Sequence, residues 1–449
     1  MAPADALLAA QQPGTPERNA RWNFRWATLC GALFECGAAF VETGTVVAAF
    51  LGRLTPSPVA VGAAESIARV GWLLPQILVA NYAQGLRYRK PIYLIAGWGR
   101  AACLGFLAGL LLVWPDAPRA SGSELVLAAF FVLWTAFSLV SGLAGVPYND
   151  IIGRTVPSNR RSRLLAGRAF VGGLLGVGAG WVIRVTLQAT PDGLLPYGLI
   201  FATGAVVLAL STGCFALVRE PPAMLVRPRS RLLAFLVDGG RVLQQDRRFR
   251  LFLAAQLLAG LTTMAAPFYL VHARQIGAIA EAEVGTFVAA QMLGGLALNP
   301  LWGWWGDRRG KLSLLKVLAW AGAVSPGLAI ALPWLSLGSA GITLAAYAII
   351  FFFLGSVSSG RVVADLGYLM EISPDERRPQ YSGYMNVLVA PSRVLPLLAG
   401  VFISVSSFEV LFALAALAVL ARLAVLARLE PQAPTVPAPP RGAGTQPPS

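Results

Sequence analysis

The chain has 449 residues, of which 56% are hydrophobic and only 13% are charged, and its formal net charge is +15. A soluble domain carries roughly 25% charged residues, so the composition excludes an ordinary soluble protein and predicts an integral membrane protein. Lys and Arg fall in short clusters between apolar runs, which excludes a basic nucleic-acid-binding face. The single His and the four Cys lack the spacing of metal ligands, so we expect no metal site and no cofactor.

Apolar segments long enough to span a bilayer, about 20 residues each, recur along the whole chain. The twelve predicted spans are 26–50, 59–80, 91–114, 124–146, 164–188, 195–218, 251–273, 284–305, 312–334, 339–360, 381–404 and 407–429. They predict an all-α integral membrane protein with twelve transmembrane helices in two six-helix halves. The expected parts are a cytosolic N-terminal tail (1–25), a first half (26–218), a basic cytosolic linker (219–250), a second half (251–430) and a Pro-rich cytosolic tail (431–449).

Basic residues are strongly biased toward alternate loops of this topology. The opposite loops contain only Arg53, Arg119 and Arg274. Loops rich in Lys and Arg stay in the cytosol, so both termini and the linker are expected to be cytosolic. We therefore expect a multi-pass protein of the bacterial inner cell membrane, a monomer surrounded by the lipid bilayer.

Two acids interrupt the apolar stretch "CGALFECGAAFVETG" at 30–44, namely Glu35 and Glu42. On a continuous helix, residues seven apart lie within about 20° of one face and about 10 Å apart. An ionised acid that faced lipid would be costly, so we expect both side chains to face a central cavity. There they would bind a coupling proton or the substrate.

Further charges lie in the other spans of the first half. Glu65 and Arg69, four residues apart in the second span, suit either a structural ion pair or a coupling role. Arg100, near the middle of the third span, is expected to bind an anion or to pair with a Glu. The second half has only Arg393 at comparable depth, so charge chemistry is predicted to belong to the first half.

An internal repeat supports the division into halves. "TVPSNRRSRLLAG" at 155–167 aligns with "ISPDERRPQYSGY" at 372–384, and both copies lie between the fourth and fifth spans of their half. The matched residues are Pro157 with Pro374, Arg160 with Arg377, and Arg161 with Arg378, and the acids that precede the two copies are Asp150 and Asp365.

The loop after the eighth span reads "GWWGDRRGK" at 303–311. With six-plus-six spans and a basic central loop, the sequence resembles the major facilitator superfamily, whose signature here is Gly-x-x-x-Asp-Arg-x-Gly-Arg/Lys. The residues that fit are Gly303, Asp307, Arg308, Gly310 and Lys311. The resemblance implies a latch that stabilises the outward-facing state; the alternative is a basic loop that only sets topology. The counterpart at 81–90, "NYAQGLRYRK", offers no matching Asp.

The fifth span contains a stripe of small residues, Gly172, Gly176 and Gly180, between Arg168 and Arg184. Antiporters of the superfamily carry a Gly-rich motif with Pro at this place, but the missing Pro favours simple close packing of helices. The two Arg lie near the span's ends, where long side chains can reach the membrane interfaces.

No nucleotide-binding loop of the Gly-x-x-x-x-Gly-Lys-Ser/Thr type and no catalytic constellation occurs in the sequence, so we expect neither a primary pump nor an enzyme. We predict a secondary active transporter that moves a small molecule by alternating access. Proton-coupled efflux, as in an antiporter, is favoured over uptake. The alternative is a non-transporting membrane sensor or scaffold built on the same fold.

Overall fold

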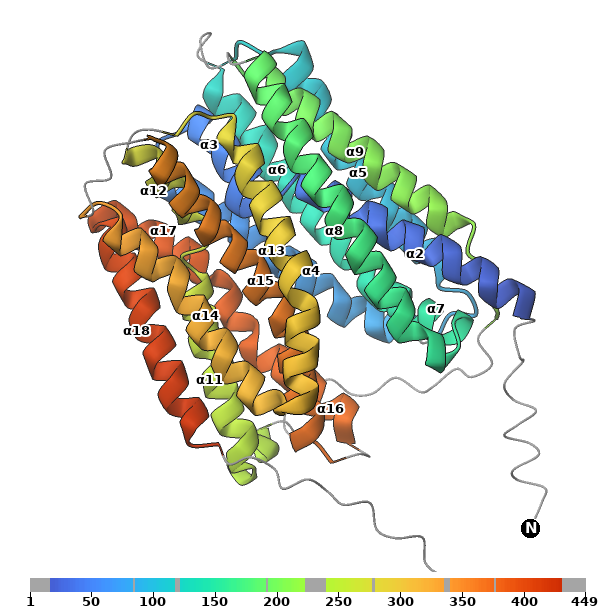
Figure 1. The fold of residues 1–449 in the computed structure, drawn as a ribbon. Coiled ribbons are helices and arrows are strands. Elements are labelled where there is room, and N and C mark those ends of the chain that lie inside the picture. The colour runs from blue at the N-terminus through green and yellow to red at the C-terminus, as the bar shows by residue number, and fades with distance from the viewer. Residues whose placement is uncertain are drawn as a thin grey trace, which may run out of the picture.

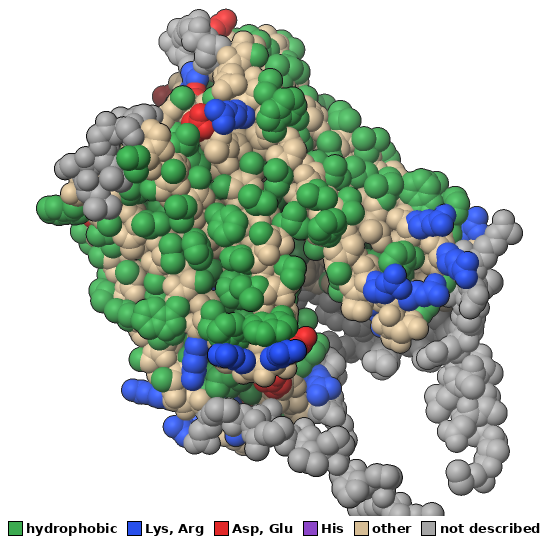
Figure 2. Space-filling model, in the orientation of Figure 1, with side chains coloured by type: hydrophobic (Ala, Val, Ile, Leu, Met, Phe, Trp, Pro, Cys, Tyr) green, Lys and Arg blue, Asp and Glu red, His purple; other side chains and the backbone are tan. Residues whose placement is uncertain are grey.

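The computed structural model describes residues 17–83, 85–117, 122–190, 193–222, 240–276, 279–334, 340–374 and 377–429. Across these ranges the chain is helical and has no β-strand. Figure 1 shows long helices arranged in two bundles. Hydrophobic side chains form a broad belt across the face of the molecule drawn in Figure 2, as expected of a surface that faces lipid.

Each of the twelve predicted spans coincides with a helix or a pair of helices, which confirms the all-α membrane fold. The first half contains α2 (Glu17–Ala39), a π-helical turn η1 (Thr43–Val47), α3 (Ala48–Leu54), α4 (Pro58–Ala83), α5 (Lys90–Val113), α6 (Ser123–Gly142), α7 (Gly145–Thr155), α8 (Ser158–Ala189) and α9 (Leu195–Ala216). The second half contains α11 (Arg247–Thr263), α12 (Phe268–Gln275), α13 (Glu283–Arg308), α14 (Lys311–Ala331), α15 (Ala340–Ile372), α16 (Arg378–Val389), a 3-10 turn η3 (Ala390–Val394), α17 (Leu395–Val405) and α18 (Phe408–Ala427).

Among the described residues, 11 segments are long and apolar enough to cross a membrane. The remaining predicted span, 59–80, is α4, a helix of 26 residues with Pro75 inside it. Most of the predicted linker and the whole C-terminal tail lie outside the described residues, so the proposed part boundaries stay a prediction.

Two pairs of helices join the halves, α8 with α13 and α4 with α17. Small residues permit these contacts. A Cβ added to Gly180 would lie 2.6 Å from the carbonyl oxygen of Gly285, and one added to Gly62 would overlap the carbonyl oxygen of Pro396. The stripe on α8 thus serves close packing: Gly176 faces Met292 of α13, and Gly172 faces Glu35 of α2.

The halves meet at one end and diverge at the other. They converge where α3 and α12 lie, and they separate toward α7 and α16 (Figure 1). We call the first the outer end and the second the inner end, following the predicted orientation. On the face shown in Figure 2, Lys and Arg side chains gather mainly at the inner end of both halves, as the loop count predicts.

The first helix of each half is broken. In the first half α2 ends at Ala39 and helix resumes at Thr43; in the second half α11 ends at Thr263 and α12 begins at Phe268. The two breaks lie against each other, because a Cβ added to Gly44 would be 3.7 Å from the carbonyl oxygen of Ala266. Such discontinuous helices place backbone polar groups and charged side chains at cavities in transporter folds.

Candidate functional site

A cavity of about 730 Å³ lies between the two halves. The first half contributes Glu42, Gly44, Glu65, Arg69 and Leu73, and the second half supplies the other lining residues. One part of the wall is aromatic, formed by Phe252, Tyr269, Phe351 and Phe353. Another part is charged. A cavity with an apolar wall and a few polar groups is the usual form of a small-molecule site.

Glu65 and Arg69 form the ion pair that their spacing predicted. Arg69 Nε lies 2.5 Å from Glu65 Oε1, and the Thr43 hydroxyl donates to the other carboxylate oxygen. Thr43 begins η1, so this carboxylate ties α4 to the broken first helix. The pair also faces the cavity, and the structural and coupling roles are therefore compatible.

Glu42 lies in the break itself and is only partly buried. It contacts Gln291 of α13 in the other half and the backbone of Gly44. Within the part of the chain that the structure describes, no Arg or Lys forms an ion pair with Glu42. The cavity therefore holds one acid that forms no ion pair among the described residues, at the contact between the halves, and Arg69 acts on it only through its charge.

Glu35 does not share the face of Glu42, contrary to the sequence prediction. That prediction assumed a continuous helix, and α2 ends between the two residues. Glu35 lies at the contact of α2 with α8, where its Oε1 is 2.6 Å from Arg168 Nη2. Arg168 therefore crosses Gly31 to reach an acid, and it donates a second hydrogen bond of 3.1 Å to the Tyr148 hydroxyl.

Arg100 does not pair with either acid. Its side chain is 3% exposed and its guanidinium lies over the Phe34 ring, 4.7 Å from the centroid. Within the described ranges it has no ion pair, and its Nε and Nη2 have no hydrogen-bond partner. It does not line the cavity, so a direct contact with a substrate there is not supported.

The second half contributes more charge than the sequence predicted. Arg361, Asp365 and Arg393 all line the cavity, and Arg422 of α18 is buried nearby. The prediction failed because it ended the tenth span at residue 360, whereas α15 continues to Ile372. The spacing of four between Arg361 and Asp365 was the available signal of a continuing helix.

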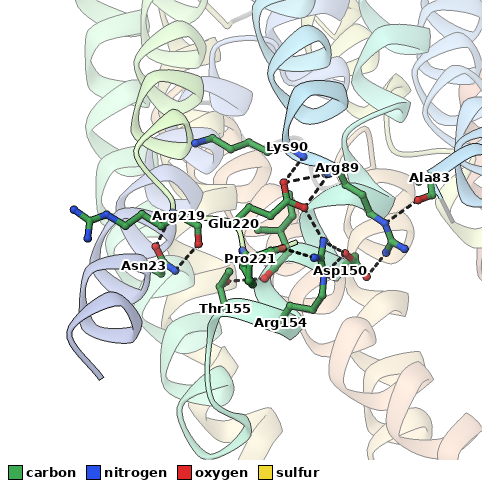
Figure 3. Close-up of polar contacts among 11 residues, drawn as sticks. Asn23, Ala83, Arg89, Lys90, Asp150, Arg154, Thr155, Arg219, Glu220 and Pro221 are labelled. Atoms are coloured by element: carbon green, nitrogen blue, oxygen red, sulfur yellow. Dashed lines mark hydrogen bonds and ion pairs between the residues drawn. The ribbon is translucent and has the colours of Figure 1, made fainter. Parts of the chain in front are cut away.

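A charge cluster at the inner end joins three helices of the first half (Figure 3). Arg154 of α7 binds Asp150 at 2.5 Å and Glu220 at 2.6 Å, and Arg89 also pairs with Asp150. Glu220 accepts backbone N–H groups of Arg89 and Lys90 at 2.9 Å, which compensates the N-terminus of α5. The acid missing from the loop at 81–90 is thus replaced by acids from α7 and from the end of the sixth span.

The repeated loop motif has different surroundings in its two copies. In the first, Pro157 precedes α8 and Arg161 donates to the Val156 carbonyl at 3.0 Å, which fixes the α7–α8 turn. In the second, Arg377 bonds to Gln380 at 3.0 Å and Asp365 faces the cavity. Residues 375–376 of this copy lie outside the described ranges.

The predicted latch loop connects α13 to α14 at the inner end. Gly310 has φ +83°, a conformation that favours Gly, so the tight turn explains this residue. Asp307 is 77% exposed and pairs with Lys311 at 2.8 Å. A Cβ at Gly303 would meet no atom within 4 Å, so close helix approach does not explain that Gly in this structure. The Arg308 guanidinium lies over the Trp304 ring.

At the outer end, Glu281 joins the halves, and we call this group the outer gate. Its carboxylate accepts hydrogen bonds from Arg53 of α3 and from the Tyr197 hydroxyl of α9, and it pairs with Arg274 of α12 at 3.0 Å. Burial alone would raise the pKa of Glu281, but the bonds from Arg53 and Tyr197 and the charge of Arg274 outweigh it and hold the pKa below its ordinary value.

A second outer ion pair joins Arg184 of α8 to Glu283 of α13 at 3.0 Å. Arg184 therefore bridges the halves, where the sequence suggested contact with the membrane interface. Two of the three basic residues that the loop count assigned to the outer side, Arg53 and Arg274, bind the same carboxylate. Residue 119, the third, lies outside the described residues.

These features define a multi-span membrane protein with the fold of a transporter. Residues 251–449 match the family model of the Major Facilitator Superfamily. No sequence among curated proteins matches the chain. This match supports the superfamily resemblance of the sequence over the second half.

Three solved structures illustrate the likeness. A mutant of the nucleoside transporter NupG has a TM-score of 0.68 and 13% identity, with 90% of this chain and 99% of that chain covered. A bacterial homologue of the iron transporter ferroportin in the inward-facing state has a TM-score of 0.64 and 16% identity, with 92% of this chain and 98% of that chain covered. A bacterial homologue of ferroportin in the outward-facing state with soaked iron has a TM-score of 0.55 and 17% identity, with 90% of this chain and 98% of that chain covered. At these identities the likeness shows the fold alone.

Proposed function

We propose that the protein is a proton-coupled secondary transporter that exports a small amphipathic molecule by alternating access. The observation that carries this proposal is the cavity between the halves, with Glu42, an acid outside the ion pairs of the described residues, at the break of the first helix. The aromatic wall suits an apolar substrate body and the charged wall suits a polar group. A substrate bound there contacts both halves, as alternating access requires.

The structure corresponds to an inward-facing state under this proposal. The ion pairs that join the halves, those of Glu281 and Glu283, lie at the outer end, and the bundles separate toward the inner end. Substrate would therefore enter the cavity from the cytosol before export.

Reconstitution in liposomes tests the proposal. A compound that raises the melting temperature of the purified protein serves as the candidate substrate. Its addition to proteoliposomes should move protons, measured with trapped pyranine, and an imposed pH gradient should accumulate it against its concentration gradient. A compound that binds but neither crosses the membrane nor moves protons would support a sensor or scaffold instead.

We expect Asp307→Asn to leave the fold intact and to favour the inward-facing state further. Asp307 is mostly exposed, and among the described residues its ion pair is with Lys311 of the same loop. Its loss should therefore change the free energy of the inward-facing state little. If the loop latches the inner end when it closes, the outward-facing state alone loses stability. Labelling of a cavity cysteine from the outside should fall several-fold. Unchanged labelling would leave the loop as a topology signal.

A further inference from the structure

Arg393 is a cation without a partner in the cavity wall. It belongs to η3, the short turn between α16 and α17, and its side chain is exposed where it lines the cavity. Within the described part of the chain it forms no ion pair and no hydrogen bond. An unpaired guanidinium at membrane depth is unfavourable unless an anion or water compensates it, and such a group marks a site that receives a ligand.

The charges around Arg393 leave a positive excess. Arg69 is paired with Glu65, and Arg361 lies 3.5 Å from Asp365 and bonds to Gln256 at 3.3 Å. Both of these cations act on Arg393 across the cavity. The acids Glu65 and Asp365 pair with these other cations, and neither forms an ion pair with Arg393, although the charge of Glu65 acts on it.

Arg422, which is buried behind the residues that line the cavity, adds to this excess of positive charge. It is 4% exposed, it lies near Arg361 and Asp365, and its Nε has no hydrogen-bond partner among the described residues. The Nε of Arg361 is also without a hydrogen-bond partner there. Four Arg therefore face three acids, Glu42, Glu65 and Asp365, so positive charges outnumber negative charges even when every acid is ionised.

We propose that the cavity binds a small organic anion and that Arg393 is its anchor. A guanidinium offers a planar pair of donors that matches a carboxylate or a phosphate group. The aromatic wall, which includes Phe351 and Phe353, would contact the apolar body of the molecule. This inference rests on the proposed transport function for its purpose, but the binding itself needs neither a membrane nor a gradient.

Matched probes test the charge preference in purified protein. The probes are 4-phenylbutyrate, 4-phenylbutyl phosphate and 4-phenylbutylammonium, which share a phenylalkyl body and differ in the charged group. The two anions should raise the melting temperature and the cation should not. Arg393→Gln should weaken anion binding roughly tenfold or more, because a hydrogen bond to a charged group is lost. Arg428→Gln is the control, since it removes the same charge from an exposed position at the end of α18.

A second measurement reports the electrostatic potential inside the cavity and needs no substrate. Ser358 lines the cavity one turn before Arg361 and is exposed, so Ser358→Cys gives a reactive thiol there. It should react with an anionic methanethiosulfonate faster than with a cationic one by roughly tenfold, relative to a free thiol. Wild-type protein corrects for the four native cysteines. Arg393→Gln should reduce this ratio several-fold and Arg428→Gln should not.

The inference is overturned if anion and cation behave alike in these two measurements, or if the anion preference persists in Arg393→Gln. The variant is expected to fold, because it removes an unpaired charge. Arg393→Lys should keep the thiol preference but bind 4-phenylbutyrate more weakly, because it retains the charge and loses the paired donors. A preference for anions without proton-linked flux would contradict the transport proposal and leave the anion site standing.

Discussion

Glu281→Gln should shift the protein from the inward-facing state toward states that are open at the outer end. The change removes the charge that three donors share, so Arg53 and Arg274 lose the carboxylate that lies between them. Repulsion between them then opposes closure. A typical coupling for such switches is about 1–3 kcal/mol, or roughly 5–150-fold in the ratio of states. The measurement is labelling of Ser358→Cys by an impermeant reagent added outside.

The matched control is Glu124→Gln, which removes an exposed carboxylate at the start of α6, also at the outer end. It should leave external labelling unchanged. If the thiol of Ser358→Cys reacts no faster in Glu281→Gln than in this control, the outer gate contributes nothing to the free energy that keeps the outer end closed. The contacts of α8 with α13 must then provide it.

The pKa of Glu281 fixes how this gate responds to acid. Its pKa is held below the ordinary value, which is about 4.3 for Glu. A carboxyl of this kind stabilises the closed gate fully above the ordinary pKa, and the stabilisation is lost only as the pH falls through the lower pKa of the closed state. External labelling, divided by the rate of a free thiol at the same pH because only the thiolate reacts, should therefore stay constant from neutral pH to about pH 5 and rise below about pH 4.

The spans, and the charges within the spans of the first half, could be predicted from sequence because each depends on composition along a single segment. The outer gate and the inner cluster could not. Glu281 and Glu220 lie outside the apolar segments, where no periodicity indicates partners, and Arg53 and Arg154, which bind them, come from helices distant in sequence. For Glu220, the only signal was an acid directly before two prolines at the end of a span.

The break in the first helix shows a different limit. The α11–α12 break ends at Pro267, a residue that the sequence marks openly. The break after Ala39 contains no Pro, and Gly44 follows only inside η1. A rule based on helical periodicity therefore placed Glu35 and Glu42 on one face. Tertiary contact with the second half, at Ala266 and Gln291, decides the local structure instead.

Glu42→Gln is expected to uncouple the transporter without unfolding it. Glu42 is the cavity acid that forms no ion pair among the described residues, and it contacts Gln291 of the other half. Gain or loss of a proton there changes the charge at the contact that alternating access must remake. Gln reproduces the shape of the protonated acid and removes the cost of an unpaired anion. Substrate exchange should persist, while accumulation driven by a pH gradient should fall to the level of empty liposomes.

Glu35→Gln and Glu65→Gln separate this role from a general need for acids. Glu35 pairs with Arg168 away from the cavity and its side chain is 41% exposed, so its variant should keep gradient-driven transport at modest cost in stability. Glu65→Gln leaves Arg69 without its partner and should lower the melting temperature. Normal accumulation by Glu42→Gln on either side of neutral pH would make this acid structural. Loss of coupling in Glu35→Gln alone would move the proton site to the contact of α2 with α8, where Arg168 and Tyr148 would be its partners.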